Sequence, residues 1–337
     1  GFEEFLEYCG PEIARHAENV IVTCDAAMYA NQQPDFNCMH RIFLPIRANG
    51  AMSVLHDLLA FFAVFGSATH IVVLGISAGP WFPFFRLLCA LGGKRLLVNV
   101  DGVEWRRTKF NIAKKLLLRC FSALAQRFSH VVIYDNEGLR DYLWNFALTK
   151  AVQINYSGDH VIRLPKSERI REVGTALTIC RIVPENNIEM LIEGALSSSL
   201  DRYTLVGNWS HSAYGRELKA RYCGDVRLVL LDAIYEAHKL SELRESCDNY
   251  LHGHSVGGTN PSLVEMLFYD CKIFCIDMSF NRVTAGNCAY YFKDENTLAL
   301  LLDTVPDTDI VKRKRRRSEY RREKIATQYI AAMGKRD

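Results

Sequence analysis

The chain has 337 residues, 49% hydrophobic and 23% charged, which is typical of a soluble globular protein and long enough for two domains of about 150 residues. Its eleven cysteines include no close CxxC pair and no histidine partners at zinc spacing, so the composition predicts reduced thiols and argues against a disulfide framework or a metal site. The net charge of +3 hides a local excess, because residues 312–324 alone carry +7 and leave −4 for the rest of the chain.

The first half of the chain alternates short apolar strands with helical patterns. Strands are predicted at 19–24, 41–44, 70–74, 95–100 and 130–134, and helices at 51–65, 83–91, 104–128 and 136–144. This rhythm indicates a parallel α/β sheet with ligands at the carboxyl ends of its strands. No GxGxxG follows any of these strands, which argues against a dinucleotide-dependent dehydrogenase. The apolar runs are shorter than the roughly 18 residues of a membrane span, and no signal peptide is visible.

The helix predicted at 104–128 is both basic and amphipathic. Its apolar stripe consists of Phe110, Ala113, Leu117, Cys120, Phe121, Leu124 and Phe128. Its basic side chains lie largely on the other faces and are Arg106, Arg107, Lys109, Lys114, Lys115 and Arg119. Such a helix suits an anionic lipid surface, and a merely solvated charged face is the alternative.

A second alternation begins after the segment QINYSGD at 153–159. Its predicted strands are 176–180, 203–206, 226–230, 249–252 and 272–276, and its predicted helices are 185–196, 215–222, 237–245 and 261–268. We therefore predict an α/β protein with two Rossmann-like domains, 1–157 and 158–310, followed by a basic C-terminal helix over 311–337.

The stretch HGHSVGGTNPSLVE at 252–265 has the pattern of an anion-binding loop. Gly257 and Gly258 let backbone amides approach a ligand closely, and Asn260 suits the cap of a helix that begins with proline. The free amides and positive dipole end of such a helix attract phosphate. Glu265, about one turn into the helix, suits sugar hydroxyls, which donate hydrogen bonds to a carboxylate. A surface turn capped by Asn260 is the alternative.

Four motifs occur in order along nearly the whole chain. They are NVDGVEWRRTKF at 99–110, CRIVPENN at 180–187, DAIY at 232–235 and HGHSVGGTNPSLVE at 252–265. Together they resemble the rhamnosyltransferase-type branch of bacterial glycosyltransferase family 4. The resemblance implies the GT-B fold, in which two Rossmann-like domains face a central cleft. It also implies a first strand and a glycine-rich loop ahead of the initial Gly-Phe-Glu, and both are expected to be missing here.

By this resemblance the catalytic residues are Asp101, Arg181 and Glu265. Asp101 takes the place of a histidine close to the transferred sugar, Arg181 grips the diphosphate, and Glu265 binds the nucleotide ribose. The expected donor-binding residues are Asn208, Ile234, Tyr235, Gly257, Gly258, Thr259 and Asn260. Three alternatives stay open: Asp101 caps a helix, Arg181 is a surface ion-pair partner, and Tyr235 is a half-buried loop aromatic.

The chain departs from the wider family at two places. Gly257 stands where the first of two glutamates is expected, and Asn186 and Asn187 stand where many relatives have a lysine. The missing cation leaves more of the diphosphate charge to Arg181 and to backbone amides. The missing glutamate leaves fewer contacts to the donor sugar, which suits a 6-deoxy sugar.

The resemblance implies a retaining glycosyltransferase that moves a deoxyhexose, L-rhamnose from dTDP-rhamnose, onto a lipid-linked saccharide in surface polysaccharide biosynthesis. No cofactor and no metal are expected, because no Asp-x-Asp pair ends a strand and arginine with helix amides would stabilise the departing diphosphate. The protein is expected in the cytoplasm, at the inner face of the cell membrane. The alternative is a nucleotide-sugar-binding relative without transferase activity.

The basic segment 312–324 precedes a helical pattern that contains Ile325, Tyr329, Ile330 and Met333. We expect this helix to cross back to the first domain, bury Tyr329 and Met333, and leave its arginines facing outward. The expected partner of those arginines is an anionic membrane surface. A solvated terminus is the alternative, and nucleic acid is considered but not expected as a partner.

Overall fold

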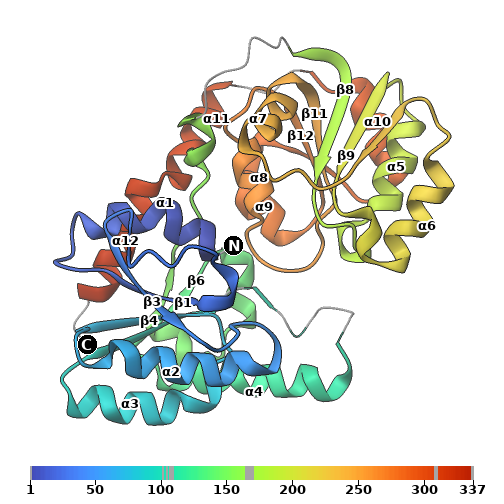
Figure 1. Cartoon of the computed structure of the whole chain (residues 1–337). Helices are drawn as coiled ribbons and strands as arrows, with labels where there is room; N and C mark the ends of the chain where they lie inside the picture. Colours follow the sequence, from blue (N-terminus) through green and yellow to red (C-terminus); the bar gives the residue numbers. More distant parts are fainter. Residues whose placement is uncertain are drawn as a thin grey trace. The chain divides into compact units, whose positions relative to one another are not determined.

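The computed structural model describes residues 2–100, 102–103, 105, 110–163, 171–306 and 310–334 (Figure 1). The chain forms two compact units. Unit 1 combines Gly1–Ser157 with Arg322–Asp337, and unit 2 is Gly158–Arg321. Each unit has its own parallel sheet and its own hydrophobic core.

Unit 1 is built on a parallel sheet with the strand order β4-β5-β6-β7. These strands are His70–Leu74, Arg95–Asn99, Val131–Tyr134 and Ala151–Gln153. A smaller sheet has the order β1-β3-β2, in which β1 and β3 are parallel and β2 is antiparallel to β3. Its strands are Ile21–Asp25 (β1), Asp35–Phe36 (β2) and Met39–Leu44 (β3).

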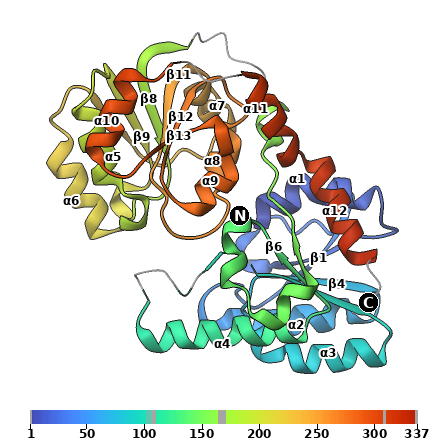
Figure 2. The same cartoon turned by 180° about the vertical axis from the view of Figure 1, so that it is seen from behind.

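The side chains of β5 alternate between two hydrophobic layers, as the two-residue period of a strand requires. Leu96 and Val98 belong to the layer under α2, α3 and α4, whereas Leu97 belongs to the layer under α1 and α12. These helices are Phe2–Ala14 (α1), Ser53–Phe65 (α2), Phe82–Leu91 (α3), Ile112–Phe128 (α4) and Arg322–Gly334 (α12). Figures 1 and 2 show the two groups on opposite faces of the sheet. The C-terminal helix is therefore part of the unit 1 core.

A buried hydrogen bond ties α12 to the end of β5. Nδ2 of Asn99 donates to the Tyr329 hydroxyl at 2.8 Å, and the Tyr329 ring packs on Phe5 with a centroid distance of 4.8 Å. Both polar side chains are buried. The bond therefore satisfies two groups that would otherwise lose their water without compensation.

Within the described residues, unit 2 contains six parallel strands in the order β10-β9-β8-β11-β12-β13. The strands are Glu172–Ile179 (β8), Arg202–Val206 (β9), Leu228–Leu231 (β10), Cys247–His252 (β11), Lys272–Ile276 (β12) and Tyr290–Phe292 (β13). The helices are Ile188–Leu196 (α5), Ala213–Tyr222 (α6), Ala237–Ser246 (α7), Pro261–Met266 (α8), Ser279–Ala285 (α9), Glu295–Thr304 (α10) and Ile310–Arg317 (α11). Strand β11 is buried along its whole length, as expected of a central strand covered on both faces.

The arginines of the basic segment do not all face outward, so that expectation is wrong. Arg313 is buried, and its Nη1 donates to the Tyr269 carbonyl at 2.6 Å. Nε of Arg316 donates to the Thr284 carbonyl at 2.7 Å, and Nη2 of Arg317 donates to the Tyr269 carbonyl at 3.3 Å. Backbone carbonyls at the ends of short helices lack hydrogen-bond donors within the helix, and these guanidinium groups donate the missing hydrogen bonds.

The predicted alternation of strands and helices is present, with differences at several ends. The helix predicted from 104 begins at Ile112 in the described part of the chain, because Oδ1 of Asn111 accepts from the Lys114 amide at 2.9 Å and caps it. Residues 104 and 106–109 lie outside the described residues. The segment predicted as a helix at 136–144 contains a 3-10 helix, Glu137–Tyr142. Five strands and helices of the described residues were not predicted: β2, β7, β13, α9 and α10.

Candidate functional site

The strand order of unit 2 determines where a ligand is expected to bind. β8 and β11 are neighbours, but the chain leaves β8 toward β9 on one side and leaves β11 toward β12 on the other. In an open parallel sheet this reversal creates a crevice at the carboxyl ends of the two strands. The residues there are Cys180 and Arg181 after β8, and the loop 253–260 after β11.

Arg181 is exposed at the end of β8, and its backbone is held in place. Its carbonyl accepts from the Val183 amide at 3.0 Å and from Nδ2 of Asn186 at 2.6 Å. Among the residues that the structure describes, the guanidinium has no hydrogen-bond or ion-pair partner, so the surface ion pair considered for it is not seen there. A fixed backbone with an open guanidinium fork suits bidentate binding of a phosphate or carboxylate.

Asn187 joins the turn after β8 to the start of the loop. It has a left-handed conformation, with φ 49° and ψ 42°, which asparagine tolerates better than most residues. Its Nδ2 donates to the Gly253 carbonyl at 2.7 Å. A Cβ at Gly253 would lie 2.3 Å from the Asn186 carbonyl oxygen, so this close approach requires glycine.

Three further hydrogen bonds hold the loop in one shape. The amide and the hydroxyl of Ser255 both donate to the Glu185 carbonyl, at 2.9 and 2.8 Å. Nδ2 of Asn281 donates to the His254 carbonyl at 3.0 Å. Gly257 lies at φ +131°, a conformation that side chains with a Cβ rarely adopt. The loop conformation is therefore fixed by bonds within unit 2.

His254 is oriented by Asn186. Because Nδ2 of Asn186 donates to the Arg181 carbonyl, its Oδ1 faces Nδ1 of His254 at 2.8 Å. A carbonyl oxygen only accepts, so Nδ1 of His254 carries the proton of this bond. One asparagine thus connects the backbone at the end of β8 with a side chain of the loop after β11.

Asn260 has the capping role that was considered for it. Its Oδ1 accepts from the Ser262 amide at 3.0 Å, and Pro261 follows as the first residue of α8. Gly258 and Thr259 are buried immediately before the cap. The predicted donor-binding residues 257–260 therefore lie together at the carboxyl edge of the sheet.

Glu265 is buried behind this loop and has two charged or polar neighbours. Its Oε2 accepts from Nη2 of Arg244, and its Oε1 lies 3.2 Å from Nε2 of His160. Burial alone would raise the pKa of Glu265, but the hydrogen bond from His160 and the charge of Arg244 bring the pKa below its usual value. The carboxylate is therefore ionised, and its bond to Arg244 is part of the unit 2 core.

His252, the last residue of β11, is buried and uncharged. Burial and the charge of neighbouring His254 lower the pKa of His252 well below its usual value. Among the described residues, Nε2 of His252 has no hydrogen-bond partner. Protonation would place an uncompensated charge in the protein interior, which is energetically unfavourable.

The remaining predicted donor contacts follow β9 and β10 at the same edge. Asn208 is exposed after β9, and its Oδ1 accepts from the Ser210 hydroxyl at 3.0 Å. Ile234 packs against the unit 2 core. Tyr235 is 88% exposed, so it is not the half-buried loop aromatic that was considered. An exposed tyrosine ring at a strand end offers a face for stacking.

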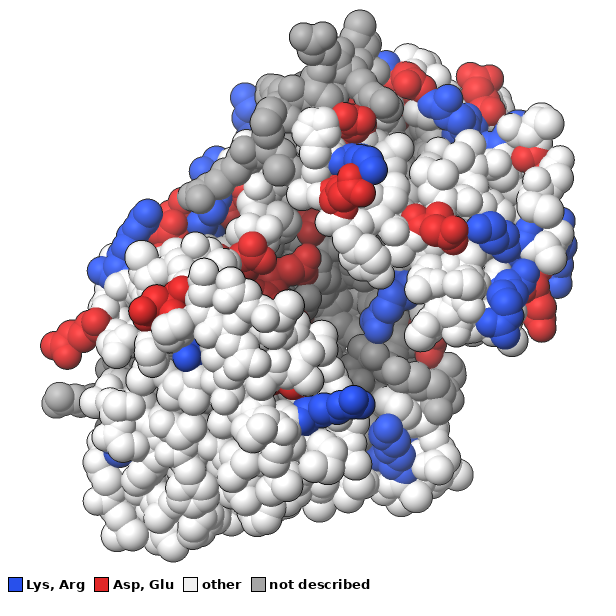
Figure 3. All heavy atoms as spheres, viewed as in Figure 1, with Lys and Arg blue, Asp and Glu red and all other residues white. Residues whose placement is uncertain are grey.

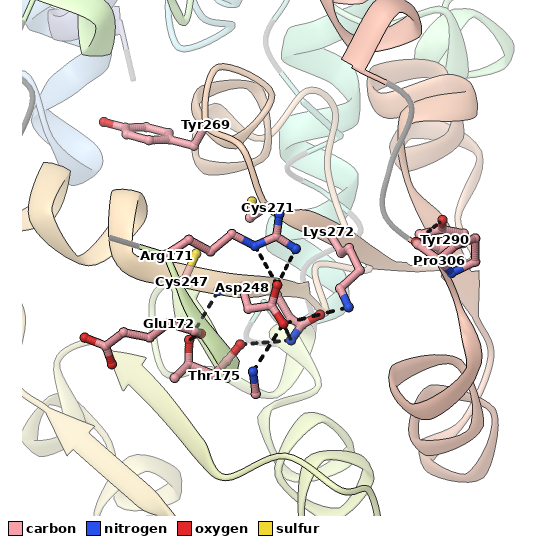
Figure 4. Close-up of polar contacts among 12 residues, drawn as sticks. Arg171, Glu172, Thr175, Cys247, Asp248, Tyr269, Cys271, Lys272, Tyr290 and Pro306 are labelled. Carbon is pink, nitrogen blue, oxygen red and sulfur yellow. Dashed lines mark hydrogen bonds and ion pairs between the residues drawn. The ribbon is translucent and has the colours of Figure 1, made fainter. Parts of the chain in front are cut away.

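The amino-terminal edge of the sheet carries a self-contained ion cluster instead (Figure 4). Nε of Arg171 donates to Oδ1 of Asp248 at 2.6 Å, and Nζ of Lys272 lies 3.8 Å from Oδ2. The Asp248 amide donates to Oγ1 of Thr175 at 3.2 Å. A cavity of about 260 Å³ nearby is lined from the same half of the sheet and from α7. These charges are already paired, so this edge stabilises unit 2 and does not resemble a binding site.

Asp101, the third predicted catalytic residue, lies outside the described residues, and its role stays a prediction. In the described part of the chain, no group of three or more His, Cys, Asp or Glu side chains is arranged to hold a metal ion. No described helix is both long enough and apolar enough to cross a membrane.

Several solved structures resemble most of the chain. Sucrose-phosphate synthase from Thermosynechococcus elongatus matches with a TM-score of 0.74 at 15% identity, over 98% of this chain and 92% of that one. Alr3699/HepE from Anabaena, in complex with UDP and glucose, has a TM-score of 0.62 at 13% identity, over 96% and 90%. The chain has the GT-B fold. The pneumococcal O-GlcNAc transferase GtfA, in complex with UDP and GlcNAc, has a TM-score of 0.59 at 13% identity, over 82% of this chain and 59% of that one.

The GT-B fold predicted from the sequence motifs is therefore confirmed. Residues 51–159 also match a family described as a domain of unknown function, DUF1972, which covers less than half of the chain. No curated protein sequence matches. These comparisons establish the GT-B fold, whereas the reaction depends on the chemistry of the site.

The sequence motifs located the strand ends of this GT-B chain but not the bonds that hold them. Asn186 and Asn187 were considered only as replacements for a lysine, whereas they connect two strand ends. Two adjacent asparagines after a proline turn were an available signal for side-chain-to-backbone bonding. His160 and Arg244, the neighbours of Glu265, lie far from it in sequence, and no local pattern indicated them.

Proposed function

We propose that this chain is a retaining, metal-independent hexosyltransferase that binds a nucleotide-sugar donor at the carboxyl edge of the unit 2 sheet. We propose dTDP-rhamnose as the donor and a lipid-linked saccharide as the acceptor, in surface polysaccharide biosynthesis at the cytoplasmic face of the membrane. The sequence resemblance supports the donor and the acceptor, and the site geometry supports the donor class.

One observation carries the proposal. Arg181, with its open guanidinium, follows strand β8, and the fixed glycine-rich loop 253–260 follows strand β11. The two strands are neighbours at the point where the strand order reverses. A diphosphate needs a cationic fork and backbone amides within reach of one another. The solved structures with UDP that share this fold add support for a nucleotide diphosphate.

Each part of the donor is assigned to a group at this edge. The diphosphate is assigned to Arg181 and to the amides of Gly257, Gly258 and Thr259. The ribose is assigned to Glu265, because an ionised carboxylate offers about four acceptor positions and only two neighbours are seen in the described part. The base is assigned to Asn208, Ile234 and Tyr235, the last of which is exposed for stacking.

The transfer itself is proposed to proceed on one face of the sugar. The acceptor oxygen forms a bond to the anomeric carbon while the bond from that carbon to the diphosphate oxygen breaks on the same face. The departing diphosphate takes the acceptor proton, so no protein base is needed. Arg181 and the loop amides donate hydrogen bonds to the diphosphate and stabilise the negative charge that develops on it as it departs. Asp101 is proposed to lie nearest the transferred sugar.

The donor sugar is the most specific part of the proposal. Gly257 offers no side chain where a glutamate would contact sugar hydroxyls, and its φ of +131° disfavours any replacement with a Cβ. A smaller set of hydroxyl contacts suits a 6-deoxy sugar such as rhamnose.

A donor panel tests the function. The protein is mixed with UDP, dTDP, GDP, ADP and their hexose and deoxyhexose conjugates, and the melting temperature is measured for each. We expect a rise with dTDP and dTDP-rhamnose, because a ligand that binds only the folded state stabilises it. Turnover is then measured with the best donor and a lipid-linked saccharide. Binding without turnover would instead support a binding relative without transferase activity, and no shift with any nucleotide would contradict the proposal.

A further inference from the structure

We propose that the outer face of unit 1 is a docking surface for an anionic lipid bilayer. We call it the α2–α3 face and define it by six exposed side chains: Leu55, Leu59, Phe62, Phe84, Leu87 and Leu91. The inference rests on the proposed function in one respect, since an enzyme with a lipid-linked acceptor must meet it at a bilayer surface.

The exposed side chains form one stripe on each helix. In α2 they recur at Leu55, Leu59 and Phe62, and in α3 at Phe84, Leu87 and Leu91, which are the spacings of a single helical face. The two stripes meet, because the rings of Phe62 and Phe84 lie 6.1 Å apart.

The core beneath this face is formed by other residues. Phe61 and Phe85 stack at a centroid distance of 3.8 Å, and both are buried. Each helix therefore has two apolar faces, of which only one is needed to pack against the sheet. The outer face remains available to a partner.

Charged side chains are nearly absent from these helices. Every exposed residue of α2 and α3 is apolar, and their only charged residues are Asp57 and Arg86, both partly buried. Asp57 accepts from the Ser77 hydroxyl at 2.5 Å and is thereby directed into the unit. Figure 3 shows a broad surface without coloured side chains over α2 and α3, with basic side chains at its margins. A contiguous apolar patch of this kind is rare on a monomeric soluble protein and marks an interaction surface.

The charges around the face select the partner. The helix α4, which packs beside α3, contains four Lys or Arg and no acidic side chain. Lys94 lies at the end of α3, with its Nζ 5.1 Å from the centre of the Phe65 ring. The first half of α4 exposes Ile112, which is 78% exposed, and Leu116 beside Lys114 and Arg119. Apolar side chains bordered by cations match the acyl boundary and the anionic headgroups of a bilayer surface.

The helices can lie on a bilayer but not cross it. No described helix has the length and apolarity of a membrane span, and α2 and α3 have 13 and 10 residues. A helix with one apolar face against the protein and another toward lipid would lie in the interfacial plane.

A second copy of the chain fits the face less well. Symmetric pairing would place the same surface on both sides of the interface, so the cations of one copy would face the cations of the other. Anionic lipid neutralises them instead. We therefore assign the bilayer as the partner of the α2–α3 face.

Vesicle co-sedimentation tests this assignment. The full chain is mixed with vesicles of phosphatidylcholine alone, and of phosphatidylcholine and phosphatidylglycerol in equal parts. We expect binding to the anionic vesicles, weakened by added salt because screening reduces attraction between charges. Leu87→Glu combined with Leu91→Glu is expected to lower the vesicle-bound fraction roughly tenfold, since it removes apolar contact and adds negative charge. The matched control is Val226→Glu with Leu300→Glu, which makes the same change at exposed positions of unit 2 and is expected to bind as the wild type does.

Two outcomes would overturn the proposal: no binding of the wild type at low salt, or equal binding of the two variants. Light scattering measures the oligomeric state and so tests a second copy of the chain as the partner. The face would be a self-association surface if the wild type is a dimer that does not bind vesicles and Leu87→Glu with Leu91→Glu converts it to a monomer. If that pair lowers the melting temperature, Leu55→Glu with Leu59→Glu tests the same face. Nucleotide binding is measured in parallel, so a failure of the donor site is seen independently of a failure to bind vesicles.

Discussion

Glu265 has two roles, and a single substitution would affect both at once. It is assigned to the donor ribose, and it also neutralises buried Arg244. We predict that Glu265→Ala lowers the free energy of unfolding by about 3 kcal/mol, because it leaves a buried guanidinium without its carboxylate. Chemical denaturation measures this change.

A second variant separates the two roles of Glu265. Arg244→Met combined with Glu265→Leu removes both buried charges and is expected to recover much of the lost stability, while donor binding stays weak. Wild-type stability of Glu265→Ala would contradict the role of Glu265 in neutralising Arg244. The ribose assignment is wrong if the stable double variant binds donor as tightly as the wild type.

His252 makes stability depend on pH in a defined window. Its pKa is held well below the ordinary 6.5 by burial and by His254, so the unfolded chain binds a proton that the folded chain does not. Stability therefore falls as pH drops below 6.5, by up to about 1.4 kcal/mol per pH unit, until the lowered pKa is reached. Glu265, whose pKa is below its ordinary 4.5, adds a further loss only at more acidic pH.

We predict that His252→Phe reduces this pH dependence. Denaturation curves are compared above and below pH 6.5 for both proteins. The variant cannot take up a proton at this position, so the loss of stability on acidification should be smaller than in the wild type. An identical slope in both proteins would mean that His252 does not carry the effect.

At the scale of elements, the turn after β8 and the loop after β11 behave as one piece. Asn186 bonds both the Arg181 carbonyl and the His254 ring. We predict that Asn186→Ala lowers stability by about 1 to 2 kcal/mol and weakens donor binding, although the residue need not touch the donor. Calorimetry with the donor and thermal denaturation give the two values. Unchanged donor affinity with lowered stability would limit Asn186 to a structural role.

The helix α11 is held by arginines that the sequence suggested would face outward. Arg316 and Arg317 donate to backbone carbonyls of unit 2. We predict that Arg316→Gln with Arg317→Gln lowers stability by about 2 kcal/mol, because buried carbonyls lose charged donors. Lys314→Gln with Arg315→Gln is the matched control at exposed positions and should be neutral in thermal denaturation. Equal melting temperatures of the two double variants would contradict the structural role.

Strong local patterns made most of the elements predictable. Strands β4 and β12 have the predicted bounds, because each is a run of four apolar residues after a single polar residue. The short strands β7 and β13 have three residues each and give no period to read. The start of α4 was missed because the cap at Asn111 lies inside a basic stretch that continues the helical pattern.

The candidate site was predictable only where it depends on local sequence. The loop glycines, the cap at Asn260 and the position of Arg181 at a strand end follow from neighbouring residues. The partners of Glu265 and the bond from Asn186 to His254 join residues distant in sequence, and only the fold brings them together. Asp101 was assigned by resemblance alone and lies outside the described residues.

At the scale of the whole molecule, the two units carry different surfaces for different partners. Unit 2 presents the carboxyl edge of a six-stranded sheet with the Arg181 fork and the fixed loop. Unit 1 presents the apolar α2–α3 face. We therefore predict that substitutions in unit 2 remove nucleotide binding alone and that substitutions in unit 1 remove lipid binding alone.

The measurement closest to the central claim is titration calorimetry of nucleoside diphosphates into the wild type, Arg181→Lys and Arg181→Ala. We predict that the wild type binds at least one of them, that Arg181→Ala binds about tenfold or more weakly, and that Arg181→Lys recovers only part, because a point charge does not reproduce a bidentate fork. Arg315→Ala, at an exposed position on α11, is the matched control and should bind as the wild type does. Full affinity in Arg181→Lys would contradict the diphosphate clamp, and no binding of any diphosphate to the wild type would contradict the account as a whole.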